Sequence, residues 1–199
     1  MQLIVISSAD NIAGEAAIIN SLFNAGLTRF HLRKPGNSIA ETCALLNGIN
    51  PVFYDRIGLH QHHALAPTYG ITRLHYTEQM RMQTTASALK SQQKNGYKLS
   101  TSIHDAQLIP SLTAFDYVFI GPVFDSLSKP GYRSSMRPDF QLNNKPAGPQ
   151  VIALGGVQHH HLLTVKVMGF NGAAVLGAIW NHPEKAIQTF EQLQASIPD

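Results

Sequence analysis

The chain lacks the features that stabilise secreted proteins or anchor a protein in a membrane. Cys43 is the only cysteine among 199 residues, so no internal disulfide can form. Its longest apolar runs are strand-length, far short of the roughly 20 residues that cross a bilayer. The opening MQLIVISSAD has no basic flank of the kind that begins a signal peptide. These absences favour a cytoplasmic enzyme that does not contact membranes.

Charge is scarce as well. Only 14% of the residues are charged, and the formal net charge is +3. The lysines and arginines are scattered, which argues against nucleic-acid binding and fits small anionic ligands better. The hydrophobic share of 44% is enough to bury a core, and no linker or low-complexity tract divides the chain. We therefore expect one domain over residues 1–199.

Short apolar segments alternate with amphipathic stretches along the whole chain. In the stretch 14–26 the apolar residues share one helical face and Gly26 supplies a stop, and in 181–194 Asn181 is a candidate N-cap. The segment 62–70 is too short and proline-broken for more than a turn of helix. The strand candidates are residues 3–7, 29–33, 56–60, 71–76, 98–103, 116–121, 150–155 and 172–177.

Eight strand–helix repeats predict a compact (β/α)₈ TIM barrel, because parallel strands need crossovers and closure removes the sheet edges. A doubly wound open sheet is the competing fold. We disfavour it because no GxGxxG motif follows any of the expected strands.

In such a barrel the chemistry lies at the carboxyl ends of the strands. Side chains two apart on a strand share a face, so we expect His31 and Arg33 to point together toward the barrel mouth. Lys34 lies on the opposite face and is expected to be a solvated surface residue. The same spacing pairs Ser102 with His104.

Glycines and hydroxyl groups follow the last three strands. Gly155 and Gly156 lie at the end of the seventh and Gly177 at the end of the eighth, where these barrels commonly bind phosphate on backbone N–H groups. The sixth strand leads into a hydroxyl-rich loop that contains Ser126, Ser128 and Lys129.

These motifs occur in an order that resembles the thiamine phosphate synthase superfamily, including its thiazole tautomerase (TenI) branch. The similarity runs through GLTRFHLRKPG, STSIHD, DYVFIGPVFDSLSK, VIALGGV and GAAVLGAIW. The resemblance implies a (β/α)₈ fold, a thiazole phosphate as the ligand and a homodimer.

Carried over residue by residue, the resemblance implies that Arg33 is the arginine of the family's Q/H-x-R motif and that His31, its first polar position, binds substrate. Ser102 corresponds to a substrate-contacting serine, and His104 to the acid–base histidine of the tautomerase branch. The resemblance also implies a substrate-binding hydroxyl–hydroxyl–lysine loop, formed by Ser126, Ser128 and Lys129. It implies that the phosphate group is bound by the glycines Gly155, Gly156 and Gly177.

The departures concern magnesium. Synthases close the third and fourth strands with acids that hold Mg²⁺ against the pyrimidine diphosphate, whereas this chain has His60 and Gln61, and later Glu78 as the nearest carboxylate. Magnesium prefers oxygen ligands. We therefore expect no metal or other cofactor, with Mg²⁺ required only if the protein is a synthase, and we favour a thiazole tautomerase with His104 as proton shuttle and Arg33 in the active site.

Three alternatives stay open. The first is a thiamine phosphate synthase that joins a pyrimidine diphosphate to a thiazole phosphate. The second is a metal-dependent hydrolase that uses the pair His60 and His62, an arrangement that suits zinc. The third is a protein that binds the precursor without turnover.

Overall fold

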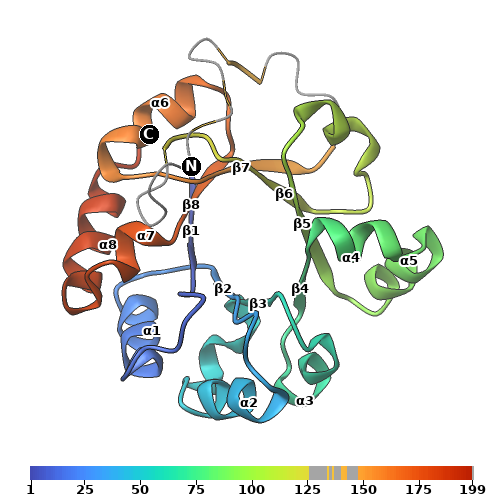
Figure 1. Ribbon diagram of the computed structural model, residues 1–199, viewed down its shortest axis with the longest axis horizontal. Helices are drawn as coiled ribbons and strands as arrows, with labels where there is room; N and C mark the ends of the chain where they lie inside the picture. Colours follow the sequence, from blue (N-terminus) through green and yellow to red (C-terminus); the bar gives the residue numbers. More distant parts are fainter. Residues whose placement is uncertain (126–133, 135, 137–139, 143–147, 199) are drawn as a thin grey trace.

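The computed structural model describes residues 1–125, 134, 136, 140–142 and 148–198. Eight parallel strands, each hydrogen-bonded to the next, close into a barrel when β8 pairs with β1. This is the predicted TIM barrel, and the helices surround the ring of strands (Figure 1). The strands are β1 (Gln2–Ile6), β2 (Phe30–Leu32), β3 (Ile57–Leu59), β4 (Arg73–Tyr76), β5 (Lys98–Ile103), β6 (Tyr117–Ile120), β7 (Gln150–Leu154) and β8 (Gly172–Val175).

Several of the crossovers are short. The segment after β3 forms one 3-10 turn and the four-residue helix α3, as its proline predicts. The α-helices are α1 (Glu15–Asn24), α2 (Ile39–Asn47), α3 (Ala66–Tyr69), α4 (Glu78–Gln83), α5 (Ala86–Lys94), α6 (Leu162–Val167), α7 (Gly177–Trp180) and α8 (Ala186–Ala195). Further 3-10 turns cover Pro51–Arg56, His63–Leu65, Ala106–Ser111, His159–His161 and Pro183–Lys185.

Local capping explains where some helices begin. Ser38 Oγ accepts a hydrogen bond from the Glu41 N–H at the start of α2, and the Ser38 N–H donates one to the Glu41 carboxylate, which forms a capping box. The expected cap at Asn181 is wrong. A 3-10 turn from Pro183 precedes α8, so that helix begins at Ala186 and Asn181 instead follows the end of α7.

The buried residues form two layers. The larger one packs the outer faces of the strands against the helices, with Phe23, Phe30 and Phe190 among its members. The smaller one fills the inside of the barrel on the side of β1, β6, β7 and β8 and consists of Ile4, Ile6, Tyr117, Phe119, Ile152 and Ala174. On the side of β2 to β5 the buried residues inside the barrel include polar ones, namely His31, His60, His75 and Ser100.

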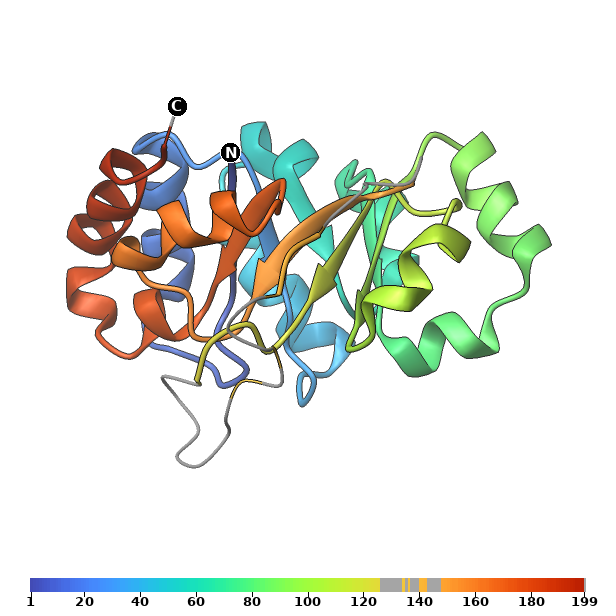
Figure 2. The same cartoon turned by 90° about the horizontal axis from the view of Figure 1, so that it is seen from above.

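Both chain termini lie on one side of the barrel (Figure 2). Because β1 starts at Gln2 and all strands run parallel, that side holds the amino ends of the strands, and the carboxyl ends face the opposite side. The loop after β1 and the loop after β2 therefore meet at the carboxyl-end mouth. In the part of the chain that the structure describes, no helix is both long and apolar enough to cross a membrane.

Candidate active site

Three histidines from neighbouring strands converge inside the barrel. His31 on β2 shares a hydrogen bond of 2.8 Å with His60, which follows β3, through Nδ1 and Nε2. The His75 ring on β4 stacks on the His60 ring with 3.9 Å between centroids. The three side chains are at most 3% exposed. His31 is therefore enclosed within the barrel, and it does not reach the open mouth as its spacing from Arg33 suggested.

Hydroxyl groups complete this cluster. His31 Nε2 and the Tyr117 hydroxyl lie 2.6 Å apart. His75 has a serine on each ring nitrogen, Ser100 at 2.9 Å from Nδ1 and Ser102 at 3.0 Å from Nε2. Burial, followed by the charges of nearby groups, lowers the pKa of all three histidines and brings that of His75 to about 3. The imidazoles are therefore neutral at physiological pH.

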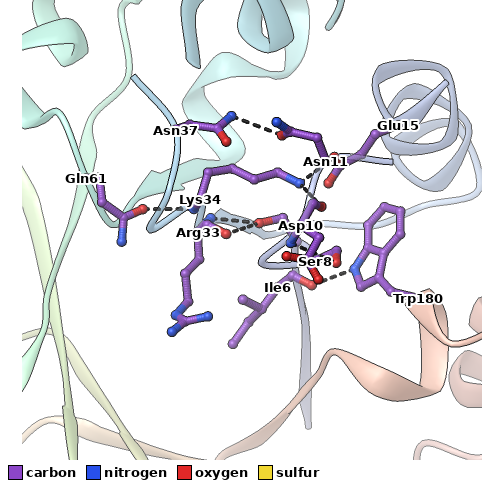
Figure 3. Close-up of polar contacts among 11 residues, drawn as sticks. Ile6, Ser8, Asp10, Asn11, Glu15, Arg33, Lys34, Asn37, Gln61 and Trp180 are labelled. Atoms are coloured by element: carbon purple, nitrogen blue, oxygen red, sulfur yellow. Dashed lines mark hydrogen bonds and ion pairs between the residues drawn. The ribbon is translucent and has the colours of Figure 1, made fainter. Parts of the chain in front are cut away.

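Arg33 is held at the mouth by its backbone. Its N–H donates to Ser7 Oγ at 2.7 Å, and the Ser7 hydroxyl donates to the Arg33 carbonyl at 2.9 Å. These bonds tie the loop after β2 to the end of β1. The half-buried side chain extends away from this anchor, and its guanidinium group points away from the Lys34 ammonium (Figure 3). A planar guanidinium presented in this way can bind phosphate or carboxylate in a bidentate manner.

Lys34 is not the solvated surface residue that the strand pattern predicted. Its side chain is 1% exposed and its ammonium lies 2.5 Å from Glu15 Oε2, the carboxylate that opens α1. The ammonium also donates to the Asp10 carbonyl at 2.7 Å, and the Lys34 N–H donates to Gln61 (Figure 3). The strand pattern failed here because β2 ends at Leu32, so alternation no longer governs the direction of residue 34.

A cavity of about 140 Å³ opens at the carboxyl ends of β5, β6 and β7. It is much smaller than the roughly 300–1,000 Å³ of pockets for drug-sized ligands, so it suits a small ring. Its lining includes two of the predicted site residues, Ser102 and His104, together with Gly155; the other lining residues are Ile103, Phe119, Gly121, Pro122 and Leu154.

His104 has a fixed orientation at this cavity. Its Nδ1 lies 2.7 Å from the Gly121 carbonyl, which can only accept a hydrogen bond. The proton of the neutral ring is therefore on Nδ1, and the lone pair is on Nε2. The side chain is exposed, so this nitrogen can exchange a proton with a ligand.

The two glycines after β7 have a packing reason to be glycine. Both have positive φ, 96° at Gly155 and 65° at Gly156. A Cβ at Gly155 would come within 2.8 Å of Pro122, and one at Gly156 within 2.2 Å of the Asp125 carbonyl oxygen. Backbone packing against the segment after β6 thus accounts for both, whether or not phosphate binds there. Gly177 begins α7. The predicted residues Ser126, Ser128 and Lys129 lie outside the described part of the chain.

The family model described as thiamine monophosphate synthase, TMP-TENI, matches residues 2–179. The chain belongs to this family. Curated relatives in it match over shorter segments. The thiamine-phosphate synthase of Salinibacter ruber is 38% identical over 78 residues, which cover 38% of this chain and 34% of that protein. The thiamine-phosphate synthase of Actinobacillus pleuropneumoniae is 30% identical over 82 residues, which cover 40% of this chain and 38% of that protein. The matched segments thus span little more than a third of these relatives.

Solved structures match this TMP-TENI family member over almost its whole length. The thiamine phosphate pyrophosphorylase from Bacteroides thetaiotaomicron is 25% identical, with a TM-score of 0.74 and coverage of 98% of this chain and 97% of that one. The thiamine phosphate pyrophosphorylase from Pyrococcus furiosus is 14% identical, with a TM-score of 0.73 and coverage of 98% of this chain and 94% of that one. At this identity it shows the shared fold alone.

The strand ends that the resemblance associates with Mg²⁺ do not fit that ion in this family member. Among the described residues there, His60 and His75 offer ring nitrogens, and Glu78 is engaged by Arg81 at 3.3 Å. Mg²⁺ requires hard oxygen ligands in octahedral geometry. The predicted zinc pair also fails, because β3 ends at Leu59 and His62 turns to the Asn37 carbonyl, 2.8 Å from its Nε2.

Sequence reasoning missed His75, Tyr117 and Glu15 as partners of the predicted residues. A signal for His75 was present, since the second, third and fourth expected strands each carry a histidine near their end. Their meeting depends on the register between strands. His31 lies level with Gly58, two residues before His60, and Gly58 lies level with Arg73, two residues before His75. The three rings therefore project into the barrel from three adjacent strands.

Proposed function

We propose that the chain is an enzyme that joins a pyrimidine diphosphate to a thiazole phosphate, as the names of its thiamine-phosphate synthase relatives describe. The family model, the curated relatives and the Bacteroides thetaiotaomicron structure support this assignment over the tautomerase that the motifs alone favoured. The structural observation that carries it is the cavity beside Ser102 and His104, at the end of the barrel where these enzymes do chemistry.

Each residue near this cavity has a task that its position supports. The apolar walls at Phe119 and Leu154 receive the thiazole ring, and Ser102 contacts it through its hydroxyl. Arg33 binds an anionic phosphate group of the substrates at the mouth, because its backbone is fixed and its guanidinium points away from the Lys34 ammonium. We keep the loop at Gly155, Gly156 and Gly177 as the proposed position of the thiazole phosphate group. His31 supports the cavity from below and does not contact substrate.

Bond formation in this reaction needs little acid–base chemistry. The thiazole nitrogen attacks the pyrimidine methylene carbon while the bond to the diphosphate oxygen breaks, and the electron pair leaves with the diphosphate. The protein's contribution is to align the two partners and to stabilise the negative leaving group. Arg33 supplies a positive charge for that purpose among the described residues. The described residues do not form a Mg²⁺ site, so no step is assigned to that ion.

The tautomerase remains a second candidate because of one specific observation. His104 is exposed at the cavity with its lone pair on Nε2, which is the group that a proton transfer between two ring positions requires. Such a positioned base is worth about 10² to 10⁴ in rate. This reaction also needs no diphosphate and therefore no carboxylate-bound metal.

One assay separates the two candidates. Purified full-length protein is incubated with thiazole phosphate, with and without the pyrimidine diphosphate, in Mg²⁺ and in EDTA, and products are resolved by chromatography. We expect thiamine phosphate, formed only with both substrates. Conversion of one thiazole tautomer into the other without condensation would identify a tautomerase, and binding without turnover a precursor-binding protein.

Two variants test the roles. Arg33→Ala should lower the condensation rate by about 10²-fold or more, since one electrostatic stabiliser of a transition state is worth on the order of 3 kcal/mol. Arg56→Ala is the matched control, because Arg56 precedes β3 at the opposite end of the barrel. His104→Gln should affect condensation less than Arg33→Ala. A larger loss of activity in His104→Gln than in Arg33→Ala, together with conversion between thiazole tautomers, would contradict the synthase assignment.

A further inference from the structure

The histidine cluster inside the barrel has the composition of a metal site. His31, His60 and His75 each offer one ring nitrogen, and these three atoms lie within 4.8 Å of one another. We propose that these three histidines bind a divalent transition metal ion, with Zn²⁺ and Co²⁺ as representative members of the class. The proposal goes beyond the thiamine-phosphate reaction and does not depend on it, since it rests on residues that lie below the cavity.

The chemistry of the ligands selects this class of metal. Neutral imidazole nitrogens suit Zn²⁺, Co²⁺, Ni²⁺ and Cu²⁺, whereas Mg²⁺ and Ca²⁺ require oxygen. The three rings are enclosed in the barrel and at most 3% exposed, so their nitrogens face one another and not bulk water. In the described part of the chain no other group of three histidine, cysteine or acidic side chains lies close enough together to hold an ion.

The surroundings already orient the rings as outer-shell partners do in metal sites. The hydroxyl of Tyr117 lies 2.6 Å from His31 Nε2, which leaves Nδ1 as the nitrogen that turns toward the other two histidines. Each ring nitrogen of His75 is hydrogen-bonded to a serine hydroxyl. When one of these serines is released, that nitrogen becomes free for a metal while the other serine still fixes the ring.

A metal requires the three rings to shift, because their nitrogens lie within 4.8 Å of one another but are not yet spaced as ligands of one ion. Zn–N distances of 2.0–2.1 Å in a tetrahedral site place ligand nitrogens about 3.4 Å apart. The distance of 2.8 Å between His31 Nδ1 and His60 Nε2 must therefore increase by about half an ångström. The His75 ring, which stacks on His60, must also turn so that one of its nitrogens points toward these two atoms. Three protein ligands leave a fourth position for water or an anion. Ser102 both bonds His75 and lines the cavity, so the cluster adjoins the space where substrate is proposed to bind.

Co²⁺ is the probe of choice because its visible absorption reports the number and geometry of its ligands. Metal-free full-length protein, prepared with a chelator that is then removed, is titrated with CoCl₂. The exposed pair His159 and His160 is replaced by glutamine in every sample, so that the surface run of histidines cannot bind the ion. We expect one Co²⁺ per chain with the intense absorption of a four-coordinate site, displaced by one equivalent of Zn²⁺. A spectrum identical to that of aqueous Co²⁺ would overturn the proposal.

Variants locate the ion. His75→Gln should abolish the four-coordinate spectrum, and Tyr117→Phe, which keeps all three ligands, should weaken Co²⁺ binding about 10–100-fold. His104→Gln is the matched control, because it removes a histidine from the neighbouring cavity and should leave the affinity unchanged. Equal loss in His104→Gln and His75→Gln would place the ion in the cavity and refute the cluster as its site. Far-UV circular dichroism shows which variants fold, and the titration of the parent protein, in which only His159 and His160 are replaced, decides the proposal even if one of them does not.

Discussion

Lys34 has its ammonium group buried inside the protein, and its replacement by methionine is a direct test of what holds the two loops at the barrel mouth together. Methionine preserves most of the volume of the side chain and removes the charge. What remains is the Glu15 carboxylate, 3% exposed, whose Oε2 has lost its ion-pair partner and whose Oε1 already has no hydrogen bond within the described residues. The variant therefore leaves a buried charge without its ion-pair partner, compensated only in part by the backbone hydrogen bond from Ile12.

The expected cost is about 3–5 kcal/mol of the free energy of unfolding, the usual effect of removing one partner from a buried ion pair. That is a large fraction of the roughly 5–15 kcal/mol by which a protein is stable. The double variant Glu15→Leu with Lys34→Met should recover most of the loss, because a buried apolar pair is often as stable as the ions that it replaces. Lys90→Met on α5 is the exposed control and should change stability by no more than about 0.5 kcal/mol.

The pH dependence identifies the cause. Burial raises the pKa of Glu15, while the bond from Lys34 lowers it in part. Without Lys34 the pKa rises further, and a group whose folded pKa exceeds its unfolded value gains folded-state stability as pH falls. The penalty of Lys34→Met should thus be larger at pH 8 than at pH 5. Urea unfolding followed by fluorescence of Trp180, the single tryptophan, measures it. A penalty under about 1 kcal/mol, or one independent of pH, would refute the buried-charge explanation.

Three further outcomes follow from the same structure. The pKa of His75 is about 3, below the ordinary 6.5, so its stabilisation is present above pH 6.5 and lost as pH falls. When the pH is lowered from 7 to 5, the free energy of unfolding of metal-free His75→Gln should therefore fall by about 2 kcal/mol less than that of the metal-free wild type, as measured by urea unfolding. Equal decreases in the two proteins would contradict this. Gly156→Ala should lower stability by at least about 1–3 kcal/mol, because φ is 65° and the Cβ would lie 2.2 Å from the Asp125 carbonyl oxygen; an unchanged melting temperature would speak against that packing. Trp180→Phe should cost about 1–3 kcal/mol by circular dichroism, because Trp180 Nε1–H donates to the buried Ile6 carbonyl at 2.7 Å, and a neutral result would mean that the carbonyl finds another donor.

The local sequence determined the barrel and the places where its chemistry could lie. Alternating apolar runs and turn residues predict all eight strands to within two residues at either end, because strand and turn preferences act over a few neighbouring positions. The ends of those strands then place Ser102 and His104 at one cavity, since closure of a parallel barrel brings all carboxyl ends to one mouth.

Only the tertiary structure decided which side chains meet. Lys34 lies beyond the end of β2, where strand alternation no longer applies, and its partner Glu15 comes from a helix 19 residues earlier. The glycines at 155 and 156 suit a phosphate loop by pattern, yet the segment after β6 packs against both of them. His31, His60 and His75 are each unremarkable as sequence. They converge because the stagger between adjacent strands, which no local preference fixes, turns all three rings into the same enclosed space.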